Sequence, residues 1–105
     1  MRVLSYVYDS ADPEPHVERV LDLLAAREDD DIEHIDLGAA SDRDDARREA
    51  VMAAKGAVRI GSLPSELFDE EGRPDFSTGA LVTEAETGRR TLHVGEEALA
   101  ALRAA

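Results

Sequence analysis

The segment Asp9 to His16, DSADPEPH, brings together a hydroxyl, several carboxylates and an imidazole. It lies between an apolar run, VLSYVY, and a leucine-rich periodic run, VERVLDLL. A Ser10 hydroxyl activated by the His16 imidazole, with Asp9 nearby, would suit a small hydrolase or lyase. No glycine-rich oxyanion loop accompanies these residues, and their spacing alone does not place Ser10 within hydrogen-bond distance of His16. The alternative is structural: the acidic side chains cap a helix, and His16 is exposed in its first turn.

The elements around this segment indicate a strand followed by a helix. Residues 2–8 are apolar at odd and at even positions, with Val3 and Val7 expected on one face and Tyr6 on the other, which is typical of an interior strand. Apolar residues between 17 and 24 recur with helical spacing and predict an amphipathic helix of about 13 residues, ended by the acidic run 29–31. In open α/β sheets, ligands bind where such a strand ends and its helix begins. We therefore expect a ligand crevice here, formed by Asp9, Ser10, Asp12 and His16.

The next elements complete a strand, helix, strand unit and add a second helix. Residues 32–37 (IEHIDL) predict a strand parallel to the first, joined to it by a right-handed crossover. Ser41 is expected to cap a helix over residues 42–55, with Asp44 completing an imperfect capping box. This helix is rich in alanine and poor in large apolar side chains, and Gly56 is expected to end it.

The second half of the chain begins with an irregular link and ends with regular elements. Residues 61–76 carry two prolines, two glycines and many acids, and only residues 64–68 suit a single helical turn. Residues 80–94 predict an antiparallel hairpin with Gly88 at a left-handed turn position. A final helix is expected to follow Gly95, with glutamates in its first turn.

This order of elements resembles the thioredoxin-like superfamily over nearly the whole chain. The most specific pieces are RVLSYVYDSADPEPHVERVLDLL, which is similar to the first strand, active-site loop and first helix, and GALVTEAETGRRTLHVGEEALAAL, which is similar to the terminal hairpin and helix. The resemblance implies an α/β fold with one thioredoxin-like domain over residues 1–105. Its three layers would enclose a mixed sheet of about four strands. Such a fold supports many functions and does not by itself assign one.

Two features of that superfamily are changed in this sequence. Members that reduce disulfides carry cysteine in the loop between first strand and first helix, whereas this chain has no cysteine, so dithiol redox chemistry is excluded. The resemblance also places a cis-proline just before the hairpin, where this chain has Thr78 and Gly79. Pro64 is the substitute considered for this position, but using it would make residues 65–68 the strand and would leave the strand beginning at residue 80 unexplained. We therefore add Thr78 to the expected crevice.

The charge of the chain is strongly acidic. Asp and Glu number 24 against 12 for Lys and Arg, giving a net charge of -12, and Lys55 is the only lysine. Self-repulsion at this charge weakens a compact state in dilute buffer, and molar salt screens it. The composition resembles that of haloarchaeal proteins; an acidic protein of a mesophile is the alternative.

Composition and spacing argue against several classes of partner. No local basic cluster suits nucleic acid, and no segment suits a membrane, so we expect a cytoplasmic protein. His16, His34 and His93 come from three separate elements without metal-ligand spacing, and the acidic runs 29–31 and 42–45 lack the pattern of a calcium loop. We predict no cofactor and no metal.

The function expected from these observations is a non-catalytic module for interaction or ligand binding that forms a homodimer. Self-association would cover the little apolar surface that a chain of 105 residues can expose. The strand at residues 92–94 would contribute if it lies at the sheet edge. Alternatively, the apolar residues of the link fold back as a lid on the core of the same chain. The candidate interface consists of Leu63, Leu67, Phe68 and Phe76.

Overall fold

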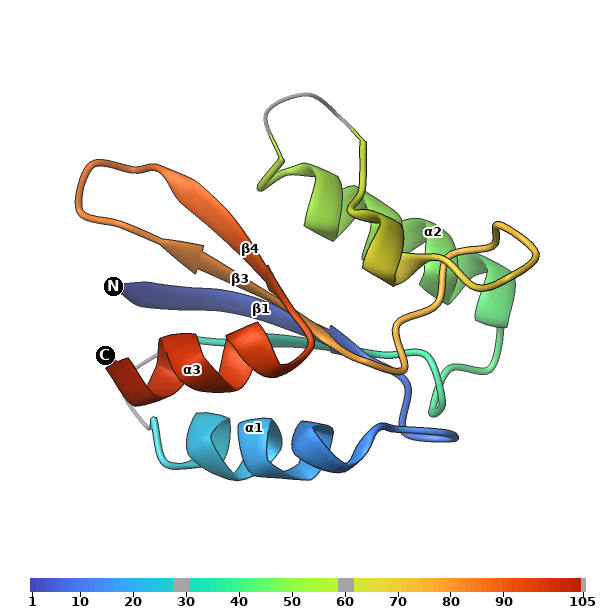
Figure 1. The fold of residues 1–105 in the computed structure, drawn as a ribbon, viewed down its shortest axis with the longest axis horizontal. Coiled ribbons are helices and arrows are strands. Elements are labelled where there is room, and N and C mark those ends of the chain that lie inside the picture. The colour runs from blue at the N-terminus through green and yellow to red at the C-terminus, as the bar shows by residue number, and fades with distance from the viewer. Residues whose placement is uncertain (28–30, 59–61, 105) are drawn as a thin grey trace.

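The computed structural model describes residues 1–27, 31–58 and 62–104. It has a mixed α/β architecture of three helices and a four-stranded open sheet (Figure 1). The strands are β1 (Arg2–Tyr8), β2 (Glu33–Asp36), β3 (Ala80–Glu84) and β4 (Arg90–Val94). The helices are α1 (Pro15–Ala25), α2 (Arg43–Lys55) and α3 (Glu96–Ala104), and a short 3-10 turn, η1, spans Ser65–Leu67.

The strands lie in the order β2-β1-β3-β4. β1 pairs in parallel with β2 and antiparallel with β3, which continues into β4 as a hairpin. The prediction that residues 2–8 form an interior strand is confirmed, and so is the hairpin, whose turn places Gly88 at φ 82°. β2 and β4 form the two edges of the sheet.

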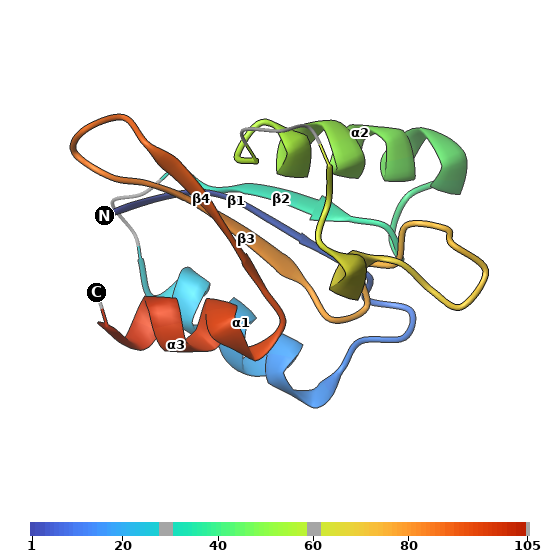
Figure 2. The ribbon, with the colours of Figure 1, turned by 45° about the horizontal axis from the view of Figure 1, so that its top comes forward.

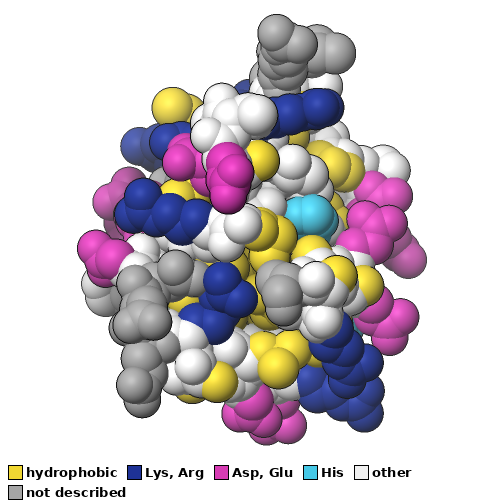
Figure 3. All heavy atoms as spheres, turned by 90° about the vertical axis from the view of Figure 1, so that its left-hand side faces the viewer, with side chains coloured by type: hydrophobic (Ala, Val, Ile, Leu, Met, Phe, Trp, Pro, Cys, Tyr) yellow, Lys and Arg dark blue, Asp and Glu magenta, His cyan; other side chains and the backbone are white. Residues whose placement is uncertain are grey.

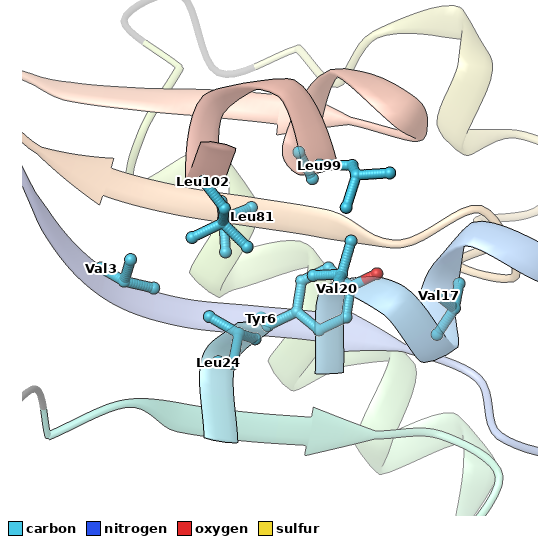
Figure 4. Close-up of a cluster of buried hydrophobic side chains, with 9 residues drawn as sticks. Val3, Tyr6, Val17, Val20, Leu24, Leu81, Leu99 and Leu102 are labelled. Carbon is cyan, nitrogen blue, oxygen red and sulfur yellow. The ribbon is translucent and has the colours of Figure 1, made fainter. Parts of the chain in front are cut away.

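The helices cover both faces of the sheet (Figure 2). α1 and α3 pack side by side on one face, and α2 lies on the other. Figure 4 shows the core beneath α1 and α3, in which Tyr6 of β1 is surrounded by aliphatic side chains of both helices and of β3. The core beneath α2 is built largely from small residues, including Ala46, Ala50 and Ala54, as its alanine-rich sequence predicts.

One expectation about β1 is wrong: Val3 and Val7 do not share a face. The pairing with β3 shifts between Val3 and Ser5, where Val3 lies opposite Thr83 and Ser5 lies opposite Val82. An extra residue at such an irregularity reverses the alternation of side chains. Val3 therefore joins Tyr6 in the core under α1 and α3, whereas Val7 packs under α2.

The helix termini also differ from expectation. α1 has 11 residues, fewer than predicted, and residues 28–30 of the acidic run lie outside the described residues. α2 is capped by Asp42 and not by Ser41: its Oδ1 accepts hydrogen bonds from the backbone amides of Asp44 (3.0 Å) and Asp45 (3.2 Å). Asp42 is the residue with extended backbone immediately before the helix, which is the geometry that a capping side chain requires.

The irregular link folds back onto the sheet beneath α2. The predicted helical turn is present as η1, and Phe68 pairs with Pro74 in an isolated bridge. Leu67 and Phe76 are 0% and 1% exposed and belong to the core under α2, so neither is accessible to a partner. Leu63 is partly buried, and Phe68 retains 39% exposure.

The residues before β3 make a tight approach to β1. No peptide bond in the described residues is cis, and Gly79 has φ 79°. A Cβ on Gly79 would overlap the hydroxyl of Tyr6, so only glycine fits there. That hydroxyl has no hydrogen-bond partner among the described residues, and burial raises the pKa of Tyr6.

Candidate functional site

A cleft of about 360 Å³ lies at the carboxyl ends of β1 and β2. The chain leaves β1 toward α1 on one face of the sheet and leaves β2 toward α2 on the other, and a crevice opens where such connections diverge. The β1–α1 loop, the first turns of α2 and the link before β3 meet at this end of the molecule (Figure 1). The charged residues lining the cleft are Asp9, Asp12, Arg43, Arg47, Asp69 and Asp75.

An ion pair joins two walls of the cleft. Nη2 of Arg43, in the first turn of α2, donates to Oδ2 of Asp9 over 2.7 Å. Oδ1 of Asp9 accepts from the backbone amide of Ala11 at 3.0 Å, so both of its oxygens are occupied. Asp9 is 8% exposed, whereas about half of the Arg43 side chain reaches solvent. The pair fixes the loop after β1 against α2 and leaves neither charge free.

Arg47 differs from Arg43 because no ion pair or hydrogen bond joins its side chain to another described residue. It lies four residues further along α2, on the same side of the helix, and also lines the cleft. Its Nε is buried and makes no hydrogen bond, and no ion pair joins its guanidinium to any described residue. A buried donor without a partner costs about 1–3 kcal/mol. The wall of the cleft therefore holds a half-buried guanidinium whose Nε has no partner among the described residues.

The three remaining carboxylates have unequal roles. Oδ1 of Asp69 accepts from the amides of Glu71 (3.0 Å) and Arg73 (2.8 Å), and Oδ1 of Asp75 accepts from the amide of Ser77 (3.0 Å). These bonds shape the link that forms one wall. Asp12 is exposed, and unlike Asp69 and Asp75 its carboxylate accepts no hydrogen bond from the described residues.

His16 lies beside the cleft and is buried, contrary to the expectation that it is exposed. Its Nε2 is 2.6 Å from the carbonyl oxygen of Thr78, which can only accept, so Nε2 carries a proton. Its Nδ1 is 3.6 Å from Oε2 of Glu14, and the amide of Glu14 donates to the carbonyl of Ser77 at 3.1 Å. These contacts tie the start of α1 to the segment before β3. His16 and Thr78 thus brace the cleft without lining it.

Ser10 is held by Asp36 at the end of β2. Oδ1 of Asp36 accepts from the backbone amides of Ser10 and Gly38, each at 2.9 Å. Burial would raise the pKa of Asp36, but hydrogen bonds from Ser10, Gly38 and Ala39 outweigh it and hold the pKa below its usual value. Among the described residues no hydrogen bond joins Ser10 to His16. Of the crevice residues expected from sequence, only Asp9 and Asp12 line the cleft.

Gly38 allows the loops after β1 and β2 to touch. A Cβ built on Gly38 would overlap the backbone nitrogen of Ala11, the hydroxyl of Ser10 and a carboxylate oxygen of Asp9. Glycine is therefore required here because of close approach, not because of a positive φ. This contact holds the loop after β1 against the loop after β2, and in this position Asp9 pairs with Arg43 of α2.

The other two histidines lie away from the cleft. His34 is exposed on β2 and meets the ring of Tyr8 edge-on, with centroids 6.4 Å apart. His93 on β4 shares a hydrogen bond of 3.0 Å with Oγ1 of Thr83; burial lowers the pKa of His93, and the carboxylate of Glu97 acts in the opposite direction. Within residues 1–27, 31–58 and 62–104, no group of three or more His, Asp or Glu side chains is arranged to hold a metal ion.

The two arginines of the cleft were missed by sequence reasoning. They lie on a helix that mixes acidic and basic residues, and such charged residues usually form a solvated face. The signal that was present is their spacing, because Arg43 and Arg47 are four residues apart and share one side of α2. At the opposite end of the molecule, basic and acidic side chains are interspersed among hydrophobic atoms (Figure 3).

Comparisons of the chain with protein-family models, with curated proteins and with solved structures find no match. None of the described helices is both long enough and apolar enough to cross a membrane. The cleft itself offers one ion pair, one unpaired guanidinium and carboxylates at its rim.

Proposed function

We propose that the protein is a non-catalytic module that binds a small polar ligand in the cleft at the carboxyl ends of β1 and β2. The observation that carries this proposal is Arg47, whose buried Nε lacks a partner in the wall of the cleft. The volume of about 360 Å³ lies within the range usual for small-molecule sites, and charged side chains form much of the lining. A ligand that accepts a hydrogen bond from the half-buried guanidinium of Arg47 would give this cation a partner that the described residues do not provide.

Binding is favoured over catalysis because the candidate nucleophile and base have other partners. The backbone amide and the hydroxyl of Ser10 both donate to the carboxylate of Asp36, and the ring nitrogens of His16 lie near Thr78 and Glu14. A general base must reach the proton that it abstracts, either directly or through one water. A hydrolase or lyase using Asp9, Ser10 and His16 would first have to break these contacts.

The arrangement of elements supports a thioredoxin-like fold as the finer description. The strand order β2-β1-β3-β4, the parallel first pair and the terminal hairpin agree with the order of elements on which the resemblance rests. The placement of α1 and α3 opposite α2 gives the three layers (Figure 2). With no cysteine in the chain, a module of this kind has no dithiol activity.

Two further proposals concern the setting of the protein. The excess of 24 acids over 12 bases supports a halophilic, cytoplasmic protein that works in concentrated salt.

The unpaired edge of β4 and the exposed ring of Phe68 support a homodimer. Light scattering in about 2 M KCl, where charge repulsion is screened, tests the dimer. A protein that stays monomeric at all concentrations contradicts the homodimer. A dimer that dissociates when Phe68 is replaced by alanine (Phe68→Ala) supports it.

The binding function is tested by mapping amide chemical shifts with a library of small acids, amines, zwitterions and neutral compounds in about 2 M KCl. We expect ligands to perturb the amides of Asp12, Arg47 and Ser77, which surround the cleft. Arg47→Met should abolish these shifts. The matched change Arg48→Met should preserve them, because Arg48 is exposed and pairs with Asp45 at 3.6 Å. If no compound perturbs the cleft, the proposed function is wrong.

A further inference from the structure

The charges of the cleft do not balance, and the imbalance indicates what a ligand must carry. Asp9 and Arg43 neutralise each other through their contact at 2.7 Å. This leaves Arg47 as the cation without an ion-pair partner among the described residues, in a lining that also includes Asp12 and the two carboxylates that shape the link, Asp69 and Asp75. Positive and negative groups are therefore both present on the walls and not compensated by one another.

A ligand that is only an anion, only a cation or neutral would pair with only some of the charged groups that line the cleft. An anion would reach Arg47 but would also meet carboxylates that repel it. A cation would suit Asp12 but would leave the half-buried guanidinium of Arg47 without an anionic partner. A neutral molecule would leave both charges unpaired. Only a ligand that carries both a negative and a positive charge pairs with Arg47 and with Asp12.

On the basis of the proposed function, we infer that the ligand is a zwitterion about the size of an amino acid, with one carboxylate and one protonated amine. The guanidinium of Arg47 presents forked N–H donors, which match a carboxylate through two parallel hydrogen bonds. The amine pairs with the carboxylate of Asp12, which lines the same cleft. The remaining part of the ligand contacts the apolar portion of the wall, formed by Leu37, Pro74 and Phe76.

The size of the cleft agrees with this class of ligand. A volume of about 360 Å³ equals the liquid volume of roughly a dozen waters at about 30 Å³ each. An amino acid with an aliphatic side chain occupies less than this and leaves room for bridging water. Nucleotides and longer peptides would extend beyond the described walls.

The experiment is calorimetry with four probes that share one side chain and differ in charge. Leucine is the zwitterion, leucine methyl ester the cation, N-acetyl-leucine the anion and N-acetyl-leucine amide the neutral form. Leucine should bind roughly tenfold or more tightly than each of the others, because each blocked probe loses at least one charged hydrogen bond. Equal or tighter binding of any blocked probe overturns the inference.

Variants assign the two charges of the ligand. Arg47→Gln should weaken the binding of leucine and of N-acetyl-leucine but not that of the ester. Asp12→Asn should weaken the binding of leucine and of the ester but not that of N-acetyl-leucine. Arg48→Gln and Asp22→Asn are the matched controls and should change nothing, because both residues are exposed and lie outside the cleft. If library compounds of another class bind the cleft and leucine does not, the zwitterion inference fails while the binding function stands. If no compound binds there, both fail.

Discussion

Nε2 of His16 lies 2.6 Å from the carbonyl oxygen of Thr78, although 62 positions separate the two residues in the chain. This bond joins the first turn of α1 to the segment that leads into β3. The neighbouring bond from the amide of Glu14 to the carbonyl of Ser77 runs between the same two segments. Together they hold the β1–α1 loop, which carries Asp12, at a fixed distance from Ser77 on the facing wall of the cleft.

Replacing His16 with alanine should destabilise the fold by about 2 kcal/mol, because the carbonyl of Thr78 loses its donor and a buried ring is removed. Urea unfolding at constant KCl concentration measures this change. His34→Ala is the control and should cost less than about 0.5 kcal/mol, since His34 is exposed. Equal losses for the two variants would mean that the contact between His16 and Thr78 contributes nothing.

Arg47→Met should leave the free energy of unfolding unchanged or raise it in the absence of ligand. The change removes a buried Nε that has no partner and keeps most of the aliphatic volume. Arg43→Met should lower stability, because Asp9 is 8% exposed and would lose its ion-pair partner. Denaturant unfolding of both variants gives the comparison. A large loss in Arg47→Met would show that its guanidinium stabilises the fold and is not reserved for a ligand.

Acid should weaken the junction between the loops after β1 and β2. The pKa of Asp36 is held below its usual value of 3.8, so the contribution of Asp36 is complete well above that pH and is lost as the pH falls through the lower folded-state pKa. Asp36→Asn should therefore reduce the loss of stability between about pH 5 and pH 2. Thermal midpoints across this range, compared with those of Asp22→Asn, test the assignment. An unchanged pH profile in Asp36→Asn would contradict it.

Folding should also depend on salt, because the chain carries a net charge of -12. The thermal midpoint, followed by circular dichroism, should rise between about 0.1 and 3 M KCl as the Debye length falls from about 10 Å to below 3 Å. Equal midpoints at the two ends of this range would exclude adaptation to concentrated salt.

Features set by local sequence were predictable. The interior position of β1 and the hairpin around Gly88 follow from hydrophobic periodicity and turn chemistry within a few residues. The displacement of Val3 to the other face was not predictable, because it arises where β1 pairs with β3. His16 was expected at the surface because the local sequence shows no partner for it. Its partner in the structure, Thr78, comes from a distant segment.

In the candidate site, too, residues placed by local sequence were predictable and residues placed by distant contacts were not. Asp9 and Asp12 were recognisable from their place after a buried strand. Arg47 was not, because its role depends on a cleft that α2 forms with the link containing Asp69 and Asp75. Periodicity describes which side of a helix a residue occupies but not which distant segment covers that side.

The most direct test of the binding site is the side-chain Nε–H resonance of Arg47 in a nitrogen-15 spectrum during titration with leucine. In the free protein this group is buried and has no partner. Binding of a carboxylate should shift its resonance and slow its exchange with water, while the Nε–H resonance of the exposed Arg48 stays in place. A titration in which leucine binds while the Arg47 resonance does not move, or moves no more than that of Arg48, would contradict the proposed site.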